Sequence, residues 1–131
     1  MSELLTRELT APAVNLENKP FFDAAAEGRF LIKRCQACGE AHWYPRTICP
    51  NCHSDRTVWE ESRGEGVVYT YSIMRRASAP YAIGYVTLAE GPSMLTNFVG
   101  MAPEELKIGL RVKVILQPTE GLPVPVFGPA Q

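Results

Sequence analysis

Four cysteines constrain this chain more than any other feature. They are the only cysteines among 131 residues, and they form two C-x-x-C pairs, Cys35/Cys38 and Cys49/Cys52, separated by ten residues. Each C-x-x-C turn directs both of its sulfurs to one side, so two pairs can surround a single ion tetrahedrally. The glycine after the first pair and the proline inside the second favour such turns. The sequence therefore predicts a rubredoxin-like ribbon with these cysteines as metal ligands.

Zinc is the predicted metal, with one structural ion per chain, because four thiolates leave no open position for water or substrate. A rubredoxin-type iron centre uses the same four ligands and would make the chain an electron carrier. The two histidines of the sequence, His42 and His53, are the remaining candidate ligands. We expect both to be packed or solvated ribbon residues, since four sulfurs already satisfy the ion.

Composition favours a soluble globular protein. Apolar residues make up 46% of the chain, enough for a core, and no apolar run approaches the roughly 20 residues that cross a bilayer. The segment "MSELLTRELTAPAV" lacks the apolar stretch and cleavage site of a signal peptide. We therefore expect a cytoplasmic protein without membrane partners. In a reducing compartment, paired cysteines are more often metal ligands than disulfides.

Charge is unevenly distributed. Residues 29–76 hold eight basic and five acidic side chains, a net charge of +3, although the whole chain is close to neutral. Lys33, Arg34, Arg46 and Arg56 would offset the negative charge of four thiolates around one divalent ion. The chain has no dense basic stripe, so we expect no nucleic-acid partner. A nucleic-acid-binding ribbon and barrel stays open as an alternative function.

The chain divides into three predicted segments. Residues 1–17 show no sustained period and are predicted to be an arm, residues 18–59 a helix and ribbon, and residues 60–131 a barrel. Within the second segment, Asn18 is the expected helix cap and Gly28 the expected stop. Pro20 falls in the first turn of this helix, which carries an apolar stripe of one phenylalanine and two alanines. A strand over residues 29–35 leads into the first cysteine pair.

The remaining chain alternates short β segments with turns. A single helical turn is expected over residues 102–109, with Pro103 near its start and Gly109 as its stop. This turn bridges the third and fourth of five strands, which is typical of an oligonucleotide/oligosaccharide-binding (OB) barrel. The fold class is therefore mainly β. The predicted strands are residues 66–73, 81–89, 93–99, 111–116 and 124–127.

Several motifs in this order resemble the acyl-CoA-associated zinc-ribbon/OB-fold proteins known as domain of unknown function family 35. The motifs are "RCQACG", "PRTICPNC", "GEGVVYTY", "EGPSMLTNFVG" and "IGLRVKV". The resemblance covers residues 18–128. It implies a subunit without catalytic residues of its own that pairs with a thiolase-like enzyme (thiolase, aldolase, acyltransferase or hydroxymethylglutaryl-CoA synthase) or with a hotdog-fold hydratase. It also implies that the subunit helps to build the acyl-CoA channel.

The residues themselves agree with an accessory role. Both histidines lie in the ribbon, every cysteine is assigned to metal, and the sequence contains no glycine-rich phosphate loop. Arg75 and Arg76, between the first two barrel strands, are candidates for binding a CoA phosphate, with a solvated loop as the alternative.

Apolar and aromatic residues are the candidates for contact with a partner. We expect most of Tyr69, Tyr71, Tyr81 and Tyr85 to be core or half-buried, with one lining an interface. The segment "GLPVPVFGPA" is expected either to dock on a partner or to seal the barrel. The N-terminal arm is the other expected docking segment.

Overall fold

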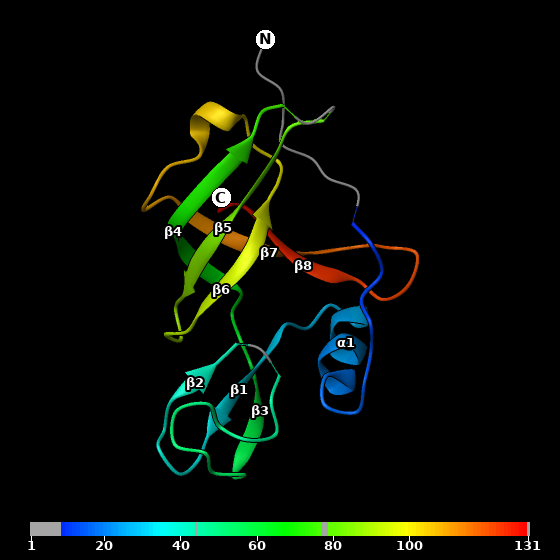
Figure 1. Ribbon diagram of the computed structural model, residues 1–131, viewed down its shortest axis with the longest axis vertical. Coiled ribbons are helices and arrows are strands. Elements are labelled where there is room, and N and C mark those ends of the chain that lie inside the picture. Colours follow the sequence, from blue (N-terminus) through cyan, green and yellow to red (C-terminus); the bar gives the residue numbers. More distant parts are fainter. Residues whose placement is uncertain (1–8, 44, 77–78, 131) are drawn as a thin grey trace.

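The chain forms a three-stranded ribbon sheet and a five-stranded closed barrel, with one helix beside them (Figure 1). This computed structural model describes residues 9–43, 45–76 and 79–130. The predicted fold class, mainly β with an N-terminal helix, a ribbon and a five-stranded barrel, is confirmed. Within the described ranges, no helix is long and apolar enough to cross a bilayer.

Helix α1 (Lys19–Ala26) begins and ends close to the predicted residues. Its apolar stripe, Phe21, Ala24 and Ala25, is buried. The chain leaves the helix at Gly28, whose φ of +83° favours glycine. These features follow the sequence prediction.

The predicted side-chain cap is wrong. Asn18 occupies the N-cap position, but its side chain makes no capping hydrogen bond. Its Oδ1 instead accepts from the Asn15 amide at 2.8 Å, and its Nδ2 donates to the Ala13 carbonyl at 3.2 Å. Asn15 takes the capping role one turn earlier, because its Oδ1 accepts from the amides of Glu17 and Asn18, both at 2.9 Å.

The ribbon sheet has the strand order β2-β1-β3. Strand β1 (Leu31–Cys35) is the predicted strand, two residues shorter at its start. Two further strands, β2 (Ala41–His42) and β3 (Thr57–Glu61), were not predicted and pair antiparallel with β1 on its two sides. Together these strands hold the loops that carry the cysteines.

The barrel closes in the order β4-β5-β6-β8-β7. Its neighbouring strands are antiparallel except β6 and β8, which run parallel and pair through Phe98 and Phe127. A 3₁₀ turn, η1 (Pro103–Glu105), connects β6 to β7 as predicted. The five strands lie close to their predicted positions: β4 (Glu65–Met74), β5 (Tyr81–Leu88), β6 (Ser93–Phe98), β7 (Arg111–Gln117) and β8 (Val124–Pro129).

One hydrophobic core runs through both modules. It includes Phe21 and Phe30 from the helix and ribbon as well as Phe98 and Phe127 from the barrel. The rings of Phe30 and Phe127 meet edge to face, with centroids 6.3 Å apart. The core is continuous across residue 59, so no gap in packing separates the ribbon from the barrel. The division of the chain into segments at this residue stays a prediction.

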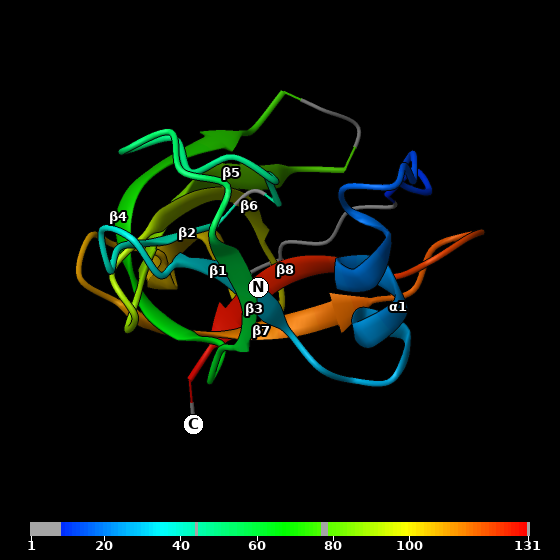
Figure 2. The same ribbon diagram turned by 90° about the horizontal axis from the view of Figure 1, so that it is seen from below.

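The C-terminal apolar segment belongs to the barrel. Val126 and Phe127 are fully buried in β8, so this strand cannot serve as an extended docking segment, and the sealing alternative is correct. The described part of the arm runs beside the loop between β7 and β8 (Figures 1 and 2), where Ala11 lies close to Gly121.

Candidate metal centre and ligand pocket

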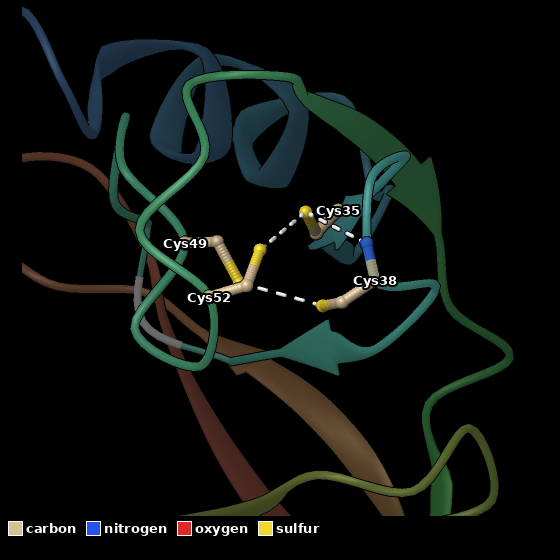
Figure 3. Close-up of side chains that lie close together, drawn as sticks. All are labelled: Cys35, Cys38, Cys49 and Cys52. Carbon is tan, nitrogen blue, oxygen red and sulfur yellow. Dashed lines mark hydrogen bonds between the residues drawn. The ribbon is translucent and has the colours of Figure 1, made fainter.

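The four cysteine side chains point toward one another (Figure 3). All four Sγ atoms lie within 4.8 Å of one another, and the Cys35–Cys52 and Cys38–Cys49 sulfurs are 3.6 and 3.7 Å apart. Sulfurs at the corners of a tetrahedron around zinc, each about 2.3 Å from the ion, would be about 3.8 Å apart. The cluster therefore has the dimensions of a four-thiolate metal site.

Backbone amides support the sulfurs in the same way at both turns. The amides of Ala37 and Asn51 donate to the sulfurs of Cys35 and Cys49, each at 3.3 Å. The amide of the residue after each pair then closes the turn: Gly39 donates to the Cys35 carbonyl and His53 to the Cys49 carbonyl, both at 2.9 Å. The two turns therefore hold the sulfurs of Cys35 and Cys49 by the same pattern of hydrogen bonds.

The pKa values of the thiols show why the cluster suits a cation. Hydrogen bonds from the amides of Cys38 and Ala37 lower the pKa of Cys35 to about 6. The Glu40 amide lowers the pKa of Cys38, but desolvation and the neighbouring thiols outweigh it and raise that pKa to about 12. The Cys35 and Cys38 thiols therefore resist becoming thiolates together, and a divalent cation would supply the missing positive charge.

Arg34 and Lys33 precede Cys35 on β1 and make different interactions. Arg34 binds the carboxylate of Glu60 with two hydrogen bonds, at 2.8 and 3.0 Å, and also donates to the Gly39 carbonyl at 2.8 Å. Lys33 is buried with its ammonium 4.5 Å from the centre of the Trp59 ring, and burial lowers its pKa.

Neither histidine of the ribbon joins the cluster of potential ligands in the described part of the chain. His42 is buried, and burial lowers its pKa, so its imidazole is neutral at pH 7. His53 is exposed and has a φ of +67°. This placement agrees with the expectation that each histidine is a packed or solvated ribbon residue.

Arg75 and Arg76 lie together at the end of the β4–β5 hairpin. They line a surface pocket of about 490 Å³ with Ile73, Met74 and Tyr81. The pocket combines two guanidinium groups with an apolar wall, a combination that fits an amphipathic ligand carrying phosphate.

Three of the four tyrosines are more exposed than predicted. None belongs to the buried core, and Tyr69, Tyr71 and Tyr85 remain 63%, 40% and 45% exposed. Only Tyr81 is largely covered. The alternation of β4 did not predict this exposure, because the register of β4 against β5 shifts between Val68 and Thr70.

The fold and the cysteine cluster define a class of protein in which a four-cysteine ribbon is joined to an OB barrel. Family models for ChsH2 match both parts: the rubredoxin-like zinc ribbon domain matches residues 22–58, and the C-terminal OB-fold domain matches residues 59–117. The chain belongs to this family, the ChsH2-like DUF35 proteins. The resemblance seen in the sequence motifs is thereby confirmed.

A solved structure, the Ltp2–ChsH2(DUF35) aldolase, contains a chain with the same fold. Its TM-score is 0.78 at 35% sequence identity, and the match covers 92% of the present chain and 100% of the solved one.

Two curated relatives are longer than the matched region. The probable enoyl-CoA hydratase alpha subunit of Thermomonospora curvata is 37% identical over 125 residues, 91% of this chain but 39% of the relative. A DUF35 domain-containing scaffold protein of Methanocaldococcus jannaschii is 36% identical over 92 residues, 64% of each chain. The chain thus spans less than two thirds of the length of either relative.

Proposed function

We propose that this chain is a non-catalytic, zinc-containing scaffold that forms a hetero-oligomer with a thiolase-like enzyme and helps to form its acyl-CoA channel. The observation that carries the proposal is the similarity to ChsH2, which extends over the whole of the matched chain in the Ltp2–ChsH2(DUF35) aldolase. Thiolases, aldolases and acyltransferases are the proposed enzyme classes. A hydratase is the other candidate partner, since a relative is named as a hydratase subunit.

The chemistry of the chain supports a non-catalytic role. Acyl transfer from a thioester, or cleavage of a carbon–carbon bond beside one, requires a nucleophile and a general base. All four cysteines of the sequence converge on one cluster, and His42 is buried. The proposed zinc ion would occupy the four sulfurs as a structural ion, with Cys35, Cys38, Cys49 and Cys52 as its ligands.

The pocket at the β4–β5 hairpin is the proposed contact with CoA. Guanidinium groups match the geometry of phosphate, and Arg75 and Arg76 lie beside the apolar side chains of Ile73 and Met74. We place the acyl-CoA at the interface of the complex, with a CoA phosphate on the two arginines.

The test combines the purified chain with the Ltp2 aldolase subunit and follows complex mass and aldolase activity. We expect no activity from the chain alone and a complex of the two proteins that is active. Thiolase, aldolase or hydratase activity of the isolated chain that disappears on one substitution within it would contradict the proposal.

The same assay examines the CoA contact. Replacing Arg75 and Arg76 with alanine should raise the KM for acyl-CoA, and the difference from wild type should shrink at high salt, because exposed charges are screened. The matched control replaces Arg63 and Arg111, which line a different pocket at the other end of β4. An equal rise in KM in both double variants would argue against a specific phosphate site.

A further inference from the structure

The outer surface of β4, β5 and β6 carries large apolar side chains that nothing in the described chain covers. Val67, Tyr69, Tyr85 and Leu95 are 41%, 63%, 45% and 57% exposed. We refer to these four residues as the tyrosine patch. Inner positions of the same strands, such as Val86, are fully buried, so the patch lies on the face turned away from the barrel core.

The pairing of the strands brings the patch together. Tyr85 lies in the middle strand, directly opposite Leu95 of β6 on one side and Thr70 of β4 on the other. The register shift between Val68 and Thr70 inserts Tyr69 as an extra residue beside this row. The two tyrosines and the leucine thus form neighbouring positions across three hydrogen-bonded strands, a rigid platform that loses little conformational entropy on binding.

The centre of the platform is uncharged. Strands β5 and β6 contain no charged residue, and β4 contains only Glu65, at its first position. Charge lies at one edge, where Arg111 of β7 pairs with Val67. Ligands of OB barrels commonly bind on the face that includes the second and third strands, here β5 and β6. A nucleic acid on this face would need cationic side chains along its phosphates, so the uncharged centre around Tyr85 and Leu95 favours a protein with an apolar surface.

The size of the patch also fits a protein partner. The exposed area of its four side chains is on the order of 400 Å², as large as the patches that mark interaction sites on soluble proteins. A stable interface needs about 800 Å² from each partner, with a central apolar cluster and a polar rim. The serine, threonine and asparagine side chains around the patch supply such a rim.

We infer that the tyrosine patch is the centre of the surface on which the partner enzyme subunit docks. This inference rests on the proposed function, and it assigns the docking surface to the barrel rather than to the ribbon. It also relates the docking surface to the pocket that Arg75 and Arg76 line. Met74 and Tyr81 pair at the far end of the same two strands, so an enzyme seated on the patch extends toward the pocket wall that Arg75 and Arg76 complete.

The test measures binding of the chain to the Ltp2 aldolase subunit by isothermal titration calorimetry. Tyr85→Glu and Leu95→Glu place a carboxylate in the centre of the interface and should each weaken binding by roughly 30-fold or more. Tyr85→Phe keeps the ring and should stay within a few-fold of wild type. Ile115→Glu on β7 is the matched control, because Ile115 is 44% exposed and outside the three strands.

The outcomes separate the inference from the proposed function. If the wild-type chain does not bind the aldolase subunit, the proposed function is contradicted, and the inference with it. If the wild-type chain binds and Tyr85→Glu binds equally well, or loses no more affinity than Ile115→Glu, only the inference is overturned. Self-association of the chain, or binding of a poly-dT oligonucleotide, that Tyr85→Glu abolishes would likewise overturn it. Melting temperature and metal content confirm that each variant is folded.

Discussion

His53 is held in a conformation that suits glycine. In the described ranges it is the one non-glycine residue with a positive φ, +67°, and it occupies the position that Gly39 takes, at +82°, after the first cysteine pair. An L-residue in this region carries a steric cost between its Cβ and the backbone. The second turn of the ribbon is therefore strained where the first is relaxed.

Replacing His53 with glycine should relieve this strain. We expect His53→Gly to stabilise the metal-bound chain by about 0.5–1 kcal/mol, since the relief outweighs the larger backbone entropy of glycine in the unfolded state. His53→Ala keeps a Cβ at the same φ and serves as the control. Chemical denaturation of both variants measures the difference, and equal stabilities would mean that the positive φ costs nothing here.

Arg34 and Glu60 form the best-defined ion pair of the ribbon, and it depends on pH. The side-chain hydrogen bonds from Arg34 lower the pKa of Glu60 below its usual value of 4.5. A carboxyl group with a depressed folded-state pKa stabilises the protein above its unfolded pKa, and this contribution disappears as the pH falls through the folded value. The pair is about one third exposed, so its contribution is below about 1 kcal/mol.

Removing Glu60 and removing Arg34 should lower the free energy of unfolding by different amounts. Glu60→Gln should cost up to about 1 kcal/mol at pH 7 and make stability less sensitive to acid below pH 4.5. Arg34→Ala should cost more, because it also removes the hydrogen bond to the Gly39 carbonyl in the first cysteine turn. Urea denaturation at pH 7 and pH 4 measures both. A Glu60→Gln variant with the acid sensitivity of wild type would contradict this account.

At the scale of the elements, Gly84 in β5 is essential for the close approach of β4. A Cβ at this position would lie 2.1 Å from the Thr70 carbonyl oxygen and 2.9 Å from the ring of Phe98. The register shift in β4 lies next to Thr70, and here the β4 backbone packs closely against Gly84. The irregularity that exposes Tyr69 therefore lies where position 84 has no room for a side chain. The close approach at Gly84 and the exposure of Tyr69 thus both occur at this bulge.

Gly84→Ala should destabilise the barrel by roughly 3 kcal/mol or more, because the contacts are with backbone and a packed ring that cannot move aside. Gly91→Ala is the control. Its φ of +117° is unfavourable for alanine, yet nothing lies within 4 Å of the added carbon, so a cost of about 1–2 kcal/mol is expected. Thermal unfolding compares the two variants. A Gly84→Ala chain as stable as Gly91→Ala would show that β4 can shift away from β5.

Elements with strong local signals were predictable from the sequence. The barrel strands alternate apolar and polar residues between turn residues such as Gly91, and the cysteine spacing predicted the cluster without any structure. Strands β2 and β3 were not predictable. Strand β2 has only two residues, and β3 is defined by its pairing with β1, which a local pattern does not show. The capping role of Asn15 and the exposure of Tyr69 depend on tertiary packing and on register, which a single sequence does not specify.

At the scale of the whole molecule, the continuous core couples the metal site to the barrel. Residues 30–58 contain few buried apolar side chains of their own, so binding of the proposed zinc ion should supply much of the order of this segment. Phe30 contacts Phe127, and disorder of the ribbon would therefore uncover part of the barrel core. Loss of the metal should accordingly destabilise the barrel as well as the ribbon.

Removal of the metal should lower the melting temperature of the entire chain. We expect elemental analysis to find one zinc per chain, and either a chelator or Cys49→Ala to abolish metal binding and destabilise the ribbon. His53→Ala, which leaves all four sulfurs in place, should retain the ion. Stoichiometric redox-active iron would instead favour the electron-carrier alternative, and a metal-free protein with an unchanged melting temperature would contradict a structural ion.

The parallel contact between β6 and β8 sets an order of events during synthesis. Strand β6 is complete at Phe98, but the strand that covers its free edge ends at Pro129. At typical translation rates, the ribosome needs roughly 2 to 6 s to add the residues in between. During that interval the edge of β6 has no partner strand, and an unpaired edge is a site of aggregation. A pause in translation between these two strands should therefore lengthen the exposure of this edge.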